Sequence, residues 1–250
     1  MTDARPSSGT TQNHPPASPR ARRRGELSAR QAVLVLLAIG VTGAGGYWLY
    51  QRQRPGLQAR ALYREALAAL RQHNPEQAAQ LLAGAIIRRP EFVEAHLALG
   101  DVRVELGRLL EAVDSYRQAA RLRPKQAAAF ARLGAALAAC ERFDEAEAAL
   151  EQAATLAPRD PHALVTLGHV RLLRQRWPEA AEAFVAALKL APHDAELHYD
   201  LGRAYQHAGK VEQAAEAYRQ ALKCDPKHPP AQRALAELTG AATQAGAEPR

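Results

Sequence analysis

The stretch KLAPHDAELHYDLG, Lys189 to Gly202, runs from the end of one helical segment through Pro192 into the start of another. Proline does not continue an α-helix, because its ring clashes with the preceding turn and it has no amide proton to donate. Prolines recur at a constant step of 34 residues along the chain, at Pro90, Pro124, Pro158, Pro192 and Pro226. A fixed step of this length indicates an array of stacked structural repeats.

Two other features keep the 34-residue step. A Leu-Gly pair recurs at Leu99-Gly100, Leu133-Gly134, Leu167-Gly168 and Leu201-Gly202. A large apolar residue recurs at Leu82, Tyr116, Leu150, Phe184 and Tyr218. Each unit therefore reads as two amphipathic helices with a short polar turn between them, and Asp194 is placed to cap the helix that follows it. We expect the glycine to lie where the two helices of a pair approach closely, because it has no side chain.

The composition agrees with close-packed helices, since hydrophobic residues make up 47% of the chain and aromatic residues only 5%. Such a core is built from Ala and Leu, which favour helices over strands. The net charge of +7 lies in residues 1–60, which hold nine Arg and only two acidic residues, Asp3 and Glu26. The rest of the chain is neutral and lacks the basic face that nonspecific nucleic-acid binding needs. Nucleic acid is therefore not an expected partner.

The N-terminal part differs from the repeats. Residues 1–31 are predicted to be a disordered basic tail. Residues 32–50, AVLVLLAIGVTGAGGYWLY, carry no charge and would span about 28 Å as a helix, so we predict a transmembrane helix there. Cleavage of 32–46 as a signal peptide is the alternative, with Ala44–Gly46 as the small-residue site. A linker is expected at 51–58, and the stronger arginine cluster before the span favours a cytoplasmic tail with the repeats on the other side.

The repeat resembles the tetratricopeptide family, whose unit reads W-x2-L-G-x2-Y, then A-x3-F, then P. The resemblance implies an all-α fold: a right-handed α-solenoid of about five helix-turn-helix units with a C-terminal capping helix. The units would be 59–92, 93–126, 127–160, 161–194 and 195–228, followed by the capping helix at 229–240 and a disordered tail at 241–250. Departures occur at the Trp position, which holds His96, Phe130, Leu164 and His198, and in the first unit, where Glu65-Ala66 replaces Leu-Gly.

By the same resemblance, the first helices of the units would line a concave groove that binds a peptide or helix of a partner protein. The groove residues would be Leu97, Asp101, Ala131, Ala135, His162, Val165, His169, Leu172, Tyr199, Arg203 and Gln206. The alanines in the middle leave room for a partner's bulky side chains. Tyr and Arg at the far end are residue types that often dominate binding energy. The Lys/Asn/Arg clamp with which some members of the family bind chaperone C-termini is absent.

The sequence predicts neither catalysis nor a cofactor. It contains no phosphate-binding loop, no nucleophile motif and no paired metal-ligand motif. His162 and His169 lie seven residues apart and could share a metal ion or act as a base, but no third ligand accompanies them, so we interpret them as groove residues. Cys140 and Cys224 do not form a disulfide framework. No catalytic residue, metal or small-molecule substrate is expected.

These features together predict a membrane-anchored interaction scaffold or adaptor, in which the repeats take part in assembling an envelope complex. The expected location is the bacterial inner membrane, crossed once, with the repeats in the periplasm. Two alternatives remain. One is an assembly factor of the cytochrome c maturation type that holds an apoprotein helix. The other is a cytoplasm-facing subunit of a membrane enzyme complex.

Overall fold

The structure is a computed structural model that describes residues 55–245. The chain divides into a unit Met1–Arg52 and a unit Gln53–Arg250, and all described residues belong to the second. The predicted tail at 1–31 and the predicted span at 32–50 lie outside the described residues. None of the helices that the structure describes is long and apolar enough to cross a membrane.

The described residues form helices joined by short turns, and they contain no strand. Residues 55–71 form the first of these helices. It is followed by α2 (Pro75–Arg88), α3 (Val93–Glu105), α4 (Leu109–Leu122), α5 (Ala127–Ala139), α6 (Phe143–Leu156), α7 (His162–Leu173), α8 (Trp177–Leu188), α9 (Ala195–His207), α10 (Val211–Cys224) and α11 (Pro229–Ala245).

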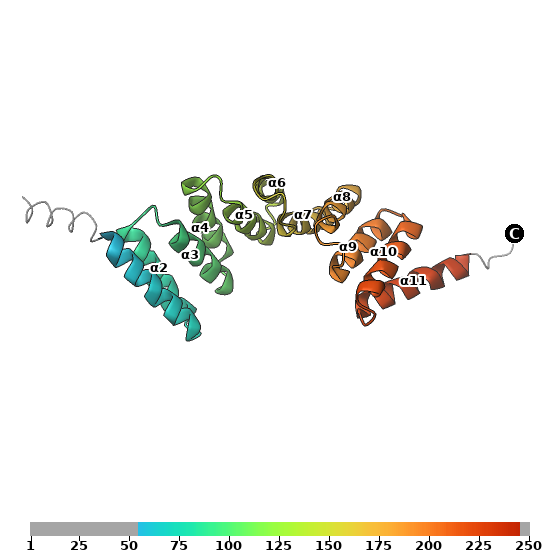
Figure 1. Cartoon of the computed structure of the whole chain (residues 1–250), viewed down its shortest axis with the longest axis horizontal. Coiled ribbons are helices and arrows are strands. Elements are labelled where there is room, and N and C mark those ends of the chain that lie inside the picture. Colours follow the sequence, from blue (N-terminus) through green and yellow to red (C-terminus); the bar gives the residue numbers. More distant parts are fainter. Residues whose placement is uncertain (1–54, 246–250) are drawn as a thin grey trace, which may run out of the picture. The chain divides into compact units, whose positions relative to one another are not determined.

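Each helix from α2 to α11 packs against the next helix in the chain, as expected for a stack of helix pairs (Figure 1). In addition, α5 contacts α7 directly, so successive first helices lie beside one another. Figure 1 shows α5 and α7 on one side of the stack and α6 and α8 on the other. We call the surface formed by helix 55–71, α3, α5, α7 and α9 the first-helix face.

The glycine of each Leu-Gly pair lies where the two helices of a pair approach, as the sequence predicts. A β-carbon at Gly168 would lie 2.5 Å from Cε1 of the Phe184 ring, and one at Gly134 would lie 2.6 Å from Cγ of Leu150. Gly100 and Gly202 meet the rings of Tyr116 and Tyr218 in the same way. These large side chains are at most 3% exposed, so the close approach is what buries them.

The turn inside each pair contains a residue in the left-handed conformation, again at a 34-residue step. This residue has a positive φ of 55–74° at His73, Gly107, Glu141, Gln175 and Gly209. Glycine adopts this conformation without strain, whereas the other three residues carry a β-carbon that opposes it. At the start of α9, the side chain of Asp194 accepts a hydrogen bond from the amide of Leu197 (3.1 Å), which confirms the predicted cap.

Two boundaries differ from the sequence prediction. The first described helix already includes residues 55–58, which were predicted as linker. Pro55 is tolerated there because the first residue of a helix needs no amide donor. At the other end, α11 continues to Ala245, past the predicted end at 240 and into the predicted tail. The lone glycine in its interior, Gly240, does not end the helix, since a single glycine costs only about 1 kcal/mol.

Candidate functional site

The candidate site is the first-helix face, and most residues predicted to line it are exposed or half-exposed. These are Asp101, Ala131, Ala135, His162, Val165, His169, Tyr199, Arg203 and Gln206. The prediction that Leu97 and Leu172 line the face is wrong. Their side chains are only 6% and 7% exposed and pack inside core clusters, where burial of apolar surface by neighbouring helices stabilises the fold. They support the face from below and do not line it.

The middle of the face is an alanine surface on α5. Ala128, Ala135 and Ala139 are exposed and Ala131 is half-exposed. Larger apolar side chains border it, since Val104 on α3 is 43% exposed and Leu173 on α7 is 66% exposed. Sequence reasoning missed Leu173, although it stands 34 residues after Ala139 and therefore at the same position of its helix. The result is an apolar area of small side chains on α5, bordered on the α3 side by Arg132, which turns toward Asp101.

Two side-chain pairs, each containing one carboxylate, cross the face at the same two positions of the repeat. Arg132 Nε lies 3.2 Å from Asp101 Oδ1, and His169 Nε2 lies 2.6 Å from Asp200 Oδ2. Counted within the 34-residue units, each pair joins position 9 of one first helix to position 6 of the next. The same two positions between α5 and α7 hold Ala135 and Thr166, which carry no charge. The alanine surface is therefore flanked by two such pairs.

Asp200 is the residue of this site that sequence reasoning missed. Its side chain is only 4% exposed, and it accepts hydrogen bonds from His169 and from Arg203 Nη1 (3.1 Å). A buried carboxylate needs such partners, because burial removes its hydration. Its position in the unit, shared with Arg132, is the signal in the sequence that points to it.

Tyr199 and Arg203 lie together at the C-terminal end of the face. The Arg203 guanidinium is 5.8 Å from the centre of the Tyr199 ring. The Tyr199 ring is in turn 5.7 Å from the Tyr218 ring and 5.3 Å from the His228 ring. Both predicted hot-spot residues are therefore held in place by neighbours, which reduces the entropy that a partner would have to remove on binding.

Two buried tyrosines reach the face with their hydroxyl groups. Tyr116 donates to Asp101 Oδ1 (2.7 Å), and Tyr218 donates to Gln206 Oε1 (2.6 Å). Burial, helped by the hydrogen bond to Asp101, raises the pKa of Tyr116 far above its ordinary value. Burial likewise raises the pKa of Tyr218. Both hydroxyls stay neutral at physiological pH and keep Asp101 and Gln206 oriented.

The histidines at the Trp position have a structural role. His96 Nε2 lies 2.8 Å from the carbonyl oxygen of Pro90, and His198 Nε2 lies 3.0 Å from that of Pro192. In both units the ring can donate a hydrogen bond to the carbonyl oxygen of the proline in the loop that follows the preceding helix. Histidine thus replaces the packing of tryptophan with a polar contact at the junction between units.

His169 forms a hydrogen bond with Asp200, a pairing that the sequence did not suggest. His162 is exposed, and its backbone amide is bound by the Asp160 side chain (3.1 Å). Among residues 55–245, no group of three or more His, Cys, Asp or Glu side chains could hold a metal ion.

A stack of helix pairs with a 34-residue step, a glycine at four of the close approaches and side-chain pairs across its first helices defines a tetratricopeptide-repeat protein. The chain belongs to the family described as the Cilia and flagella-associated protein 70 C-terminal domain, whose model matches residues 26–248. No curated protein matches the chain.

Solved structures share the fold. A MamA protein superposes with a TM-score of 0.65 at 22% identity, over 69% of this chain and 94% of that one. YrrB, described as a TPR protein with an unusual peptide-binding site, gives 0.63 at 23% identity, over 75% and 96%. MamA from Desulfovibrio magneticus RS-1, residues 41 to the end, gives 0.64 at 24% identity, over 68% and 97%. At these identities the likeness concerns the fold alone.

Proposed function

We propose that the protein is an interaction scaffold whose first-helix face binds a peptide or helical segment of a partner protein. One observation carries the proposal: the alanine surface on α5 is exposed, apolar and flanked on both sides by side-chain pairs that each contain a carboxylate. The apolar area can bury the apolar side of a segment, and the pairs can orient its polar side.

The size of the alanine side chains favours a segment with bulky apolar residues. Ala131 and Ala135 project little, so the partner's Leu or Phe side chains can approach the backbone of α5. Leu173 and Val104 would close around them from the neighbouring helices. The similarity in fold to YrrB, a TPR protein with a peptide-binding site, supports this mode of use. The role assigned to the face is binding, and it involves neither catalysis nor a cofactor.

The second part of the proposal is attachment to a membrane through residues 32–50, with the repeats on the periplasmic side of a bacterial inner membrane. The uncharged sequence of this segment supports it. In that setting the scaffold would serve the assembly of an envelope complex. Holding an apoprotein helix during cytochrome c maturation is one specific form of this role, and a cytoplasm-facing subunit of an enzyme complex is the alternative.

Topology separates these possibilities. Alkaline phosphatase fused after Arg250 is expected to be active, and green fluorescent protein at the same place to be dark, when the fusions are exported through the inner membrane. A fluorescent fusion with an inactive phosphatase fusion would instead place the repeats in the cytoplasm.

Site-specific photocrosslinking tests the binding face. Ala135 on α5 and Ala148 on α6 are both exposed alanines, on the first helix and the second helix of one pair. With benzoylphenylalanine at position 135, the full chain in intact membranes should form a discrete crosslinked band. The same probe at position 148 should form none, and the substitution Ala135→Arg should abolish capture at other positions of the face. Equal crosslinking at 135 and 148 would contradict the proposal.

A further inference from the structure

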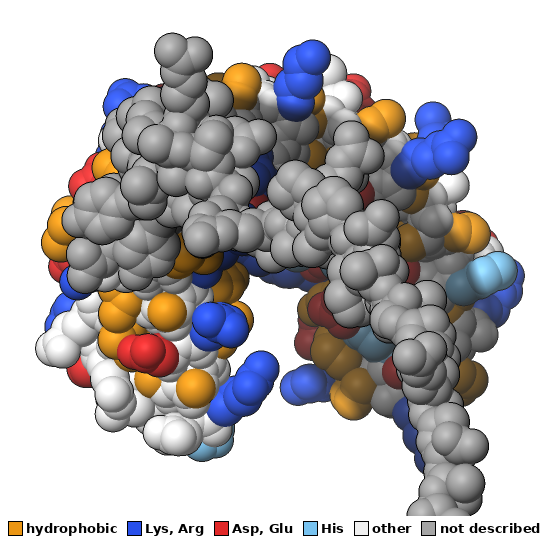
Figure 2. Space-filling view, turned by 60° about the vertical axis from the view of Figure 1, so that its left-hand side comes forward, with side chains coloured by type: hydrophobic (Ala, Val, Ile, Leu, Met, Phe, Trp, Pro, Cys, Tyr) orange, Lys and Arg blue, Asp and Glu red, His pale blue; other side chains and the backbone are white. Residues whose placement is uncertain are grey.

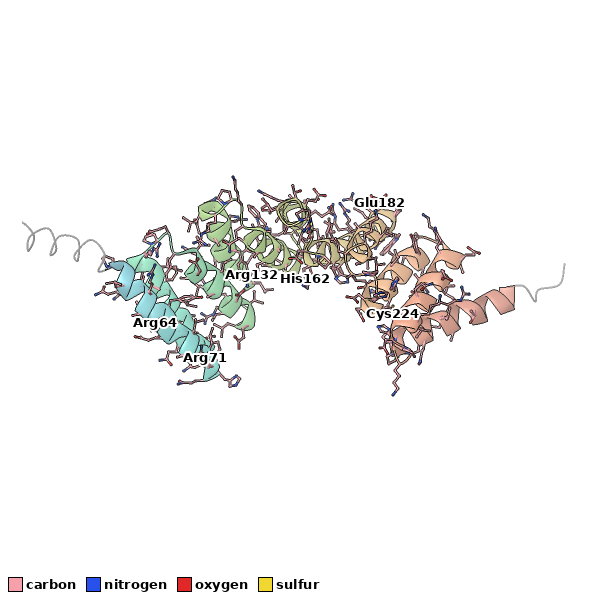
Figure 3. All side chains as sticks on the ribbon, viewed as in Figure 1. Arg64, Arg71, Arg132, His162, Glu182 and Cys224 are labelled. Carbon is pink, nitrogen blue, oxygen red and sulfur yellow. The ribbon has the colours of Figure 1, made fainter. Side chains whose placement is uncertain are left out.

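The N-terminal end of the first-helix face carries an arginine stripe formed by Arg60, Arg64 and Arg71. They are spaced by four and seven residues, so they lie on one side of helix 55–71. All three are exposed, and none of their side chains forms an ion pair or hydrogen bond with another described residue. Figure 3 labels Arg64 and Arg71 along this helix.

The 34-residue step places the arginine stripe on the same face as the candidate site. Arg60 occupies the position of His162, and Arg64 occupies the position of Arg132 and Asp200. Arg71 occupies the position of Glu105, of Ala139 in the alanine surface and of Leu173 at its border. The space-filling view shows a hollow with Lys and Arg side chains at its edges (Figure 2). A segment bound along the face would therefore meet the arginine stripe as it leaves the alanine surface.

Arg64 lacks the partner that the same position has in α5 and α9. Position 6 is occupied by Arg132, which pairs with Asp101, and by Asp200, which pairs with His169. In both cases the partner is position 9 of the preceding first helix. The structure describes no such helix before residue 55, so Arg64 offers a guanidinium group to a carboxylate from another segment.

No neighbouring acidic residue forms an ion pair with the arginine stripe: Glu94 and Asp101 pair with other arginines, and the exposed Glu65 and Glu105 pair with no described residue. Glu94 lies 2.8 Å from Arg123, and Asp101 lies 3.2 Å from Arg132. The remaining sequence offers little complementary charge. Residues 1–54 contain eight Arg but only Asp3 and Glu26 as acids, and residues 246–250 contain one Glu and one Arg. The complementary charge is therefore expected on another molecule.

We propose that the arginine stripe binds an acidic end of the same partner segment whose apolar part covers the alanine surface. This inference rests on the proposed function and adds the charge and the direction of the partner. Guanidinium groups suit this task because each can form two parallel hydrogen bonds with a carboxylate. Packed helices lie about 10 Å apart, so the arginine stripe is roughly 20 Å from α5, or about 13 residues of a helical partner.

Two designed peptides test the inference. Both are fluorescein-labelled helical peptides with a Leu cluster and, about 13 residues away, an end of three Glu or three Gln residues. Anisotropy with the full chain in neutral detergent should show the Glu peptide binding about tenfold more tightly at low salt. The advantage should shrink at high salt, because screening weakens exposed charge pairs.

Substitutions assign the effect to the arginine stripe. The variant Arg64→Gln with Arg71→Gln should remove the difference between the two peptides and leave the Gln peptide's affinity unchanged. Arg121→Gln with Arg159→Gln is the matched control, since both residues are exposed and lie outside the first helices. This control should retain the tenfold difference.

The outcomes separate the two proposals. Equal binding of both peptides overturns the inference and leaves the proposed function standing, whereas binding of neither overturns both. A dimer that dissociates in the Arg64→Gln, Arg71→Gln variant would assign the arginine stripe to a second copy of the chain and overturn the inference. If the Glu peptide loses its tighter binding in nanodiscs that contain phosphatidylglycerol but keeps it in phosphatidylcholine nanodiscs, the arginine stripe is assigned to anionic lipid. This result would likewise overturn the inference.

Discussion

Replacing Gly168 by alanine places a methyl group against the buried ring of Phe184. The new β-carbon would lie 2.5 to 2.9 Å from three ring carbons, and the ring is fully buried, so it has no free space into which to move. Overpacking of this kind typically costs about 1 to 3 kcal/mol. Alanine returns up to about 1 kcal/mol through its better helix propensity. With the full propensity gain subtracted, the expected net loss in the free energy of unfolding is about 0 to 2 kcal/mol.

Gly84→Ala in α2 is the matched control. The nearest atom to a β-carbon there is Leu62 Cδ1 at 3.5 Å, which is an ordinary van der Waals contact. The same substitution should therefore stabilise the protein by about 0.5 to 1 kcal/mol. Urea unfolding followed by circular dichroism at 222 nm measures both changes, and the double variant Gly168→Ala with Phe184→Ala should lose less than the sum of the two single variants.

The sign of the effect is the decisive result. If Gly168→Ala stabilises the protein as Gly84→Ala does, the close approach of α7 and α8 is not what requires glycine. An additive double variant would lead to the same conclusion, because the predicted cost arises from contact between the two side chains.

Three further predictions concern the site and the turns. Asp200→Ala should lower the free energy of unfolding by about 1 to 3 kcal/mol, because it removes the buried acceptor of His169 and Arg203. Glu94→Ala, which breaks an exposed pair, should lower it by less than about 1 kcal/mol. Equal losses in urea unfolding would contradict this difference. Gln175→Gly should stabilise the protein by about 0.5 to 1 kcal/mol, because glycine adopts the φ of 59° without strain, and Gly209→Ala should destabilise it by a similar amount. Thermal melting measures both changes. A destabilised Gln175→Gly variant would show that contacts of the Gln175 side chain outweigh the backbone strain. Because the pKa of Tyr218 is raised in the folded state, the unfolded state loses this proton first as the pH rises. The stability from this group is therefore fully present below about pH 10 and falls above it. The urea midpoint should decline less steeply with pH in Tyr218→Phe, and an unchanged slope would argue against the buried hydroxyl as the source of the decline.

The repeat architecture could be predicted from the sequence because its determinants are local and periodic. The prolines, the Leu-Gly pairs and the apolar positions each recur at one step, and one step places them at equivalent points of successive helix pairs. The close approach at Gly168 and the cap at Asp194 follow from single residues, and the structure confirms both. The ends of the helix array were less accurate, since no repeat beyond them fixes the register.

The candidate site was predicted as a face, and its internal contacts were not. Periodicity identifies the side of a helix on which Leu97 or Leu172 lies, but not whether the neighbouring helices cover it. It also gave no reason to join His169 to Asp200, which are 31 residues apart in the chain. The arginine stripe was missed because no groove positions were assigned to the first unit, in which Glu65-Ala66 replaces Leu-Gly.

The sequence by itself determined that the chain forms helix pairs of constant length and which side of each pair is apolar, because helix period, turn residues and breakers act within a few residues of one another. The tertiary structure decided which side chains meet across successive first helices. Which side chains meet depends on the rotation of each helix pair relative to the next. In this stack Asp200 is buried between His169 and Arg203, whereas Arg64 meets no carboxylate among the described residues. Electrostatic complementarity between repeats is thus a property of the stack, which no single 34-residue unit contains.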